Sequence, residues 1–136
     1  MTRNGPDDAT RRGTSEVDAI EGLLAYAQTR PRWGGSAVKS LSEAIARSRV
    51  LFGESPEEYS GLLARCLSTG ARLLLRRGRP AEALPLAEEA VALTRSAGGA
   101  PLVASLYRLA AVLEALHRYS EAAALVAEAD QLLPPD

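Results

Sequence analysis

Apolar residues recur every three or four positions along nearly the whole chain from residue 15 onward, so each stretch places them on one face of a helix. The first stretch carries such positions from Val17 to Ala27 and follows Ser15, a residue type that is favoured at helix N-caps. No segment has the alternation of apolar and polar residues, bounded by turn residues, that is typical of strands. The pattern therefore predicts an all-α chain.

Glycine and proline residues interrupt this pattern and divide the chain into six predicted helices. The clearest start is Ser55 followed by Pro56, because a capping residue here precedes a proline at the first helical position and two acids in the first turn. Consecutive helices are expected to pair into three antiparallel hairpins. The three units lie at about residues 15–53, 56–97 and 100–134.

The first residues of the chain have a different composition from the rest. Residues 1–14 mix glycine, proline and scattered charges without any periodicity, which predicts a disordered N-terminal tail. The helical pattern then continues to the end, so residues 15–136 are expected to form a single domain.

A short motif repeats at constant spacing. The segments LSEAI, PAEAL and YSEAA place Ala44, Ala83 and Ala122 in equivalent positions, 39 residues apart each time. An alanine where two helices cross lets them approach closely, since it removes the side-chain bulk that would separate them. The chain is therefore predicted to be built from three copies of one helical unit.

These repeats resemble the tetratricopeptide repeat family, in particular the arrays of high-GC bacterial signalling and regulatory proteins. The first unit departs from the family pattern, since its connector RPRWGGS is longer and Ser48 stands where a large apolar residue is usual. The matching positions of the middle unit are Leu67, Gly70, Ala71 and Leu74 in its first helix and Ala83, Ala87 and Ala90 in its second; those of the last unit are Leu106, Leu109, Ala110, Leu113, Tyr119, Ala122, Val126, Ala129 and Pro134.

The resemblance implies an α-solenoid of three stacked hairpins that acts as a protein-interaction module or adaptor and is not an enzyme. In the family, the first helix of each unit lines a concave groove. Arg65, Arg72 and Arg76 form one stripe there, which predicts an acidic peptide or helix as the partner. A solvated basic face paired with neighbouring glutamates remains the alternative. The predicted groove residues are Arg65, Ser68, Thr69, Arg72, Arg76, Tyr107 and Arg108.

Charge and composition narrow the classes of partner. The chain has 16 basic and 17 acidic residues, and this balance argues against binding to nucleic acid or to an anionic membrane surface. It has no apolar run long enough to span a bilayer and no signal-peptide pattern, so a cytoplasmic location is expected. One cysteine and one histidine exclude a disulfide framework and a conventional zinc site, and no cofactor is expected.

Three single residues were candidates for special roles. His117 lacks a recognisable catalytic partner and is expected to be an exposed turn residue. Cys66 lies well inside a helix, which favours packing over nucleophilic chemistry. Trp33 allows two interpretations, a plug that fills a gap beside the irregular first unit or a surface anchor for a partner.

The last predicted helix is apolar on more than one side. Its inward stripe is expected to end at Leu133, while Leu125 and Leu132 form a second stripe and a candidate dimer surface. A structural homo-oligomer is therefore the alternative function, unless this stripe packs back on the preceding hairpin. A regulatory subunit of a neighbouring enzyme is a further alternative.

Overall fold

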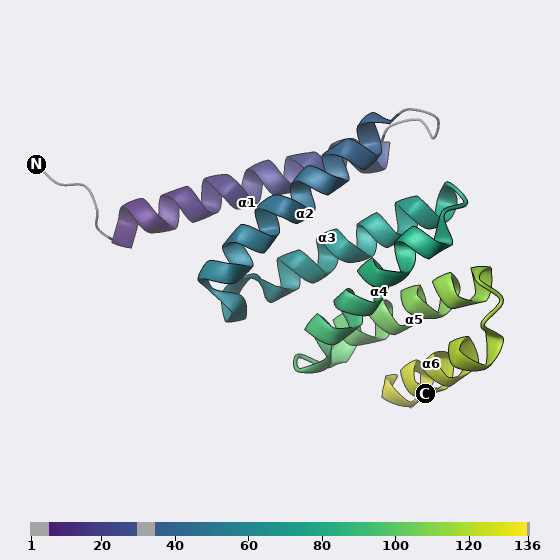
Figure 1. Cartoon of the computed structure of the whole chain (residues 1–136). Coiled ribbons are helices and arrows are strands. Elements are labelled where there is room, and N and C mark those ends of the chain that lie inside the picture. The colour runs from purple at the N-terminus through teal and green to yellow at the C-terminus, as the bar shows by residue number, and fades with distance from the viewer. Residues whose placement is uncertain (1–5, 30–34, 136) are drawn as a thin grey trace, which may run out of the picture.

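The computed structural model describes residues 6–29 and 35–135. These residues form six α-helices and no strand, which confirms the predicted all-α solenoid of three antiparallel hairpins. The helices follow one another in a row from one end of the molecule to the other (Figure 1). They are α1 (Pro6–Thr29), α2 (Ser36–Glu54), α3 (Pro56–Arg76), α4 (Pro80–Arg95), α5 (Gly99–Ala115) and α6 (Tyr119–Leu132).

Helix α1 begins nine residues before Ser15, the predicted start. The prediction of a disordered tail was therefore wrong over residues 6–14, whereas residues 1–5 lie outside the described residues. The sequence does contain a start signal at this point, because Pro6 occupies the first helical position and two aspartates follow it. Helical periodicity did not reveal it, since Val17 is the first large apolar residue of the helix.

The turn between α3 and α4 is closed by a glycine in the left-handed region. Gly78 has φ +73°, a conformation that glycine adopts without steric cost. Its N–H donates to the carbonyl of Leu75 at 3.0 Å, and the N–H of Arg79 donates to the carbonyl of Leu74 at 2.9 Å. Together with the N–H of Arg77, which also donates to the carbonyl of Leu74 at 3.1 Å, these bonds satisfy the last carbonyls of α3.

The same turn recurs between α5 and α6, 39 residues later. His117 stands at the position of Gly78 and also has a positive φ, +62°. The N–H of His117 donates to the carbonyl of Glu114 at 2.9 Å, and that of Arg118 donates to Leu113 at 2.8 Å. The repeat register therefore extends from the core alanines to the backbone of the turns.

The core is built around small residues at the helix crossings. Ala44, Ala83 and Ala122 are all buried, as their shared register predicted. Gly70 of α3 is buried as well, and a Cβ at this position would lie 3.1 Å from the Cδ1 of Leu86 on α4. The side chain of Leu86 can approach α3 this closely because Gly70 presents no side chain at the contact.

The two layers of helices are spaced differently. In the layer of first helices, α3 contacts both α1 and α5. In the layer of second helices, no Cα atoms of α2, α4 and α6 lie within 8 Å of one another over the described residues. Long side chains bridge that wider spacing, through ion pairs of Arg49 with Glu89 and of Arg95 with Glu128. The layer of α1, α3 and α5 is therefore the more closely packed of the two.

Candidate functional site

The predicted groove residues of the middle unit share one side of α3. They recur at spacings of three and four, which places them along one stripe of the helix surface. Arg65 and Arg76 are exposed, whereas Ser68, Thr69 and Arg72 are half-buried.

Arg65 is not part of a free positive surface. Its guanidinium forms an ion pair with the carboxylate of Glu21 on α1. The alternative interpretation, a basic residue paired with a neighbouring glutamate, therefore holds for this one position. The pair joins α1 to α3 within the closely spaced layer.

Arg72 and Arg76 instead lie close to Arg108 of α5, and we call these three residues the arginine cluster. No ion pair joins any of them to an acidic group within the described part of the chain. The Nε of Arg108 is buried and has no hydrogen-bond partner among the described residues. The pKa of Arg108 lies below its ordinary value, first because of burial and then because Arg72 and Arg76 place positive charge nearby.

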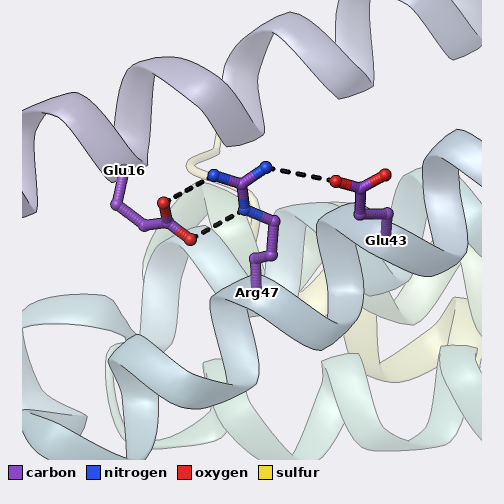
Figure 2. Close-up of polar contacts among 3 residues, drawn as sticks. All are labelled: Glu16, Glu43 and Arg47. Atoms are coloured by element: carbon purple, nitrogen blue, oxygen red, sulfur yellow. Dashed lines mark hydrogen bonds and ion pairs between the residues drawn. The ribbon is translucent and has the colours of Figure 1, made fainter.

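Many of the other arginines in the described part of the chain are neutralised by glutamates. Figure 2 shows Arg47 of α2 between Glu16 of α1 and Glu43 of its own helix. Its Nε and Nη2 donate to the two carboxylate oxygens of Glu16 at 2.8 and 2.7 Å, and its Nη1 donates to Glu43 at 3.1 Å. The remaining pairs are Arg49 with Glu89, Arg79 with Glu82, Arg95 with Glu128 and Arg118 with Glu121.

Tyr107 does not join the arginine cluster. Its hydroxyl donates to the Oδ1 of Asp130 on α6, and this bond is the main reason why the pKa of Tyr107 is raised. Successive residues of a helix point about 100° apart, so Tyr107 is directed toward α6 while Arg108 is directed toward α3. The sequence grouped the two because both map to the first helix of the last unit.

A small cavity lies beside the arginine cluster, and sequence reasoning missed it. It has a volume of about 50 Å³ and opens between α1, α2 and α3. Its apolar surface comes from one residue of each helix, so no pattern along a single helix signals it. The lining residues are Ala27, Gln28, Leu41, Thr69, Arg72, Leu73, Arg76 and Arg77.

The two leucines of the candidate dimer surface lie in different environments. Leu125 is half-buried against the core cluster that α3, α4, α5 and α6 share, whereas Leu132 is 45% exposed. Leu133 was predicted to face inward but is 47% exposed. That prediction was wrong because α6 ends at Leu132 and the backbone of Leu133 is extended, so the helical stripe does not reach it.

The remaining candidates offer little chemistry. Cys66 is buried, and burial raises the pKa of its thiol, which disfavours the reactive thiolate. His117 is exposed, and its Nδ1 lies 2.8 Å from the hydroxyl of Tyr119. Trp33 falls outside the described residues. Within the described ranges, no three His, Cys, Asp or Glu side chains are grouped to hold a metal ion, and no helix is long and apolar enough to cross a membrane.

Comparison with known proteins supports one family. A family model described as tetratricopeptide repeat matches residues 63–99, which run from within α3 through α4 to the start of α5. No curated protein and no solved structure matches the chain. The matched segment agrees with the repeated helical hairpins around it, so the chain contains a tetratricopeptide repeat at residues 63–99 within a helical-repeat architecture.

Proposed function

We propose that the concave groove formed by α1, α3 and α5 binds an acidic peptide or helix of a partner protein. Tetratricopeptide repeats act as protein-interaction scaffolds, and the arginine cluster supplies positive charge to such a surface here. The guanidinium groups would bind the partner's carboxylates by charge-assisted hydrogen bonds.

The observation that supports this proposal is the contrast between the arginine cluster and the ion-paired arginines. Arg47 and Arg49 each have a glutamate within ion-pair distance, whereas Arg72 and Arg76 repel Arg108 and none of these three has such a partner in the described residues. A bound carboxylate would relieve this repulsion and give the buried Nε of Arg108 an acceptor.

The test is a charge reversal in the groove with a matched reversal outside it. The double variant Arg72→Glu, Arg76→Glu should lower affinity for a terminally capped peptide of alternating Asp and Glu residues by about tenfold or more. The control, Arg79→Glu with Arg118→Glu, changes the same charge at two exposed turns and should leave affinity within about twofold.

Fluorescence anisotropy with a labelled peptide measures both affinities, and circular dichroism confirms that the variants keep their helicity. Affinity of the native protein should fall with added salt, because exposed charges are screened beyond about 10 Å at 0.1 M salt. Equal losses in the groove variant and the control would contradict the proposal.

The alternative, a homo-oligomer formed through the C-terminal helix, is favoured by the exposure of Leu132 and Leu133 at the end of α6. Sedimentation across a range of concentrations tests it. If the leucines form a dimer contact, the native mass doubles at high micromolar concentration, and the variant Leu132→Glu, Leu133→Glu stays monomeric. A native protein that remains monomeric throughout would rule this alternative out.

A further inference from the structure

We infer that the cavity beside the arginine cluster binds one aliphatic side chain of the partner, so that the ligand is an acidic segment carrying an aliphatic anchor residue. This inference rests on the proposed acidic-partner function and names the ligand class more narrowly. A purely charged ligand would leave the cavity unused.

The floor of the cavity is apolar. Ala27 and Leu41 are almost fully buried, and Leu73 of α3 completes the surface between them. A group the size of a water molecule needs about 10–15 Å³ of such volume, so about 50 Å³ holds about four groups. A leucine side chain has about that many carbon atoms.

The rim of the cavity carries the charge. Arg72 and Arg76 line it, and both also lie close enough to Arg108 to affect its ionisation. The aliphatic stems of such arginines cover apolar surface while their guanidinium groups stay in water. An anchor residue in the cavity would therefore have its flanking carboxylates next to the arginine cluster.

The combination explains how a small groove could select its partner. Exposed charge pairs contribute little to affinity and are screened by salt, so charge alone discriminates poorly among acidic proteins. Burial of one aliphatic side chain adds a factor of about tenfold or more in affinity that salt does not screen. The cavity thus supplies selectivity and the arginine cluster supplies attraction.

The experiment uses the full chain and two labelled peptides with blocked termini. Both consist of alternating Asp and Glu residues, and they differ only at the central residue, which is Leu in one and Ser in the other. Blocked termini ensure that no free terminal carboxylate contributes to binding. We expect the Leu peptide to bind about tenfold more tightly than the Ser peptide.

Filling the cavity should remove that preference. Thr69→Phe places a ring at the cavity wall and should reduce the affinity for the Leu peptide to that for the Ser peptide. Gln28→Phe does the same from α1, at an exposed position where the fold tolerates substitution. The matched control is Ser60→Phe, because Ser60 is likewise half-buried on α3 but is neither a groove residue nor part of the cavity lining.

The outcomes separate this inference from the proposed function. Equal affinities of the native protein for the two peptides would overturn the inference while charge-driven binding still stands. A preference for Leu that survives both filling variants, or one that Ser60→Phe also abolishes, would likewise overturn it. Failure of both peptides to bind would overturn the inference and the proposed function together.

Discussion

At the scale of single residues, His117 is the clearest case of a side chain in an unfavourable backbone conformation. A residue with a Cβ in the left-handed region costs about 1–2 kcal/mol, whereas Gly78 at the equivalent turn avoids that cost. The contact of His117 with Tyr119 offsets part of the strain at an exposed site.

We therefore expect His117→Gly to stabilise the protein. Glycine removes the strain, but its greater conformational freedom in the unfolded chain lowers the free energy of unfolding by about 0.4–1 kcal/mol. The net gain in the free energy of unfolding should therefore be about 0.5–1 kcal/mol. Urea denaturation measures the free energy of unfolding. The control is Gly78→Ala, which should destabilise the protein by about 1 kcal/mol because it introduces the same strain. A loss of stability in His117→Gly would mean that the contact with Tyr119 outweighs the strain.

At the scale of helices, the ion pair of Glu16 with Arg47 joins α1 to α2 (Figure 2). The hydrogen bonds that the carboxylate of Glu16 accepts from Arg47 hold the pKa of Glu16 below its ordinary value of 4.5. A carboxyl group whose pKa is lower in the folded protein stabilises the fold at pH values above its ordinary pKa. This contribution is lost as the pH falls through the pKa of the folded state.

We expect Glu16→Gln to lower the free energy of unfolding at about pH 7 by at most about 1 kcal/mol, since the pair is partly solvated. The difference from the native protein should shrink as the pH falls below 4.5 and through the lowered pKa of folded Glu16. Urea denaturation at several pH values measures it. The control is Glu43→Gln, which removes a bond within α2 alone and should cost only about 0.3–0.5 kcal/mol. A difference for Glu16→Gln that stays constant over this pH range would contradict the prediction.

At the scale of the whole molecule, each hairpin is stabilised by its neighbours along the chain. The backbone of α3 lies close to those of α1, α2, α4 and α5, whereas that of α6 lies within 8 Å of α5 alone, Cα to Cα, among the described residues. The end of the array should therefore open at a lower free-energy cost than its centre.

We expect native-state hydrogen exchange to be faster in α6 than in α3 by about tenfold or more, which corresponds to an opening free energy lower by about 1.4 kcal/mol. Mass spectrometry of peptic fragments resolves the two helices. Ala122→Gly should raise exchange in α6 alone, whereas the equivalent change Ala83→Gly, at the centre of the array, should also raise it in α3. Uniform exchange along the chain would contradict this nearest-neighbour picture.

Local features of the sequence are sufficient to predict most of the helices and the register of the repeats. Amphipathic periodicity and the residues that break or cap helices act over a few positions, so they predict the α3–α4 turn at Gly78 and the burial of Ala83 and Ala122. They also place Arg72 and Arg76 on one helix face, because residues four apart are neighbours there.

The charge of the groove was decided only by the tertiary structure. Arg65 has the spacing of a groove residue but is neutralised by Glu21, which is 44 positions earlier in the chain. Arg108 of α5 lies close to Arg72 of α3, across the interface between the two helices. The cavity is likewise shared by three helices. Ion pairing and cavity shape depend on distances between side chains of different helices, and the spacing of residues along one helix does not contain those distances.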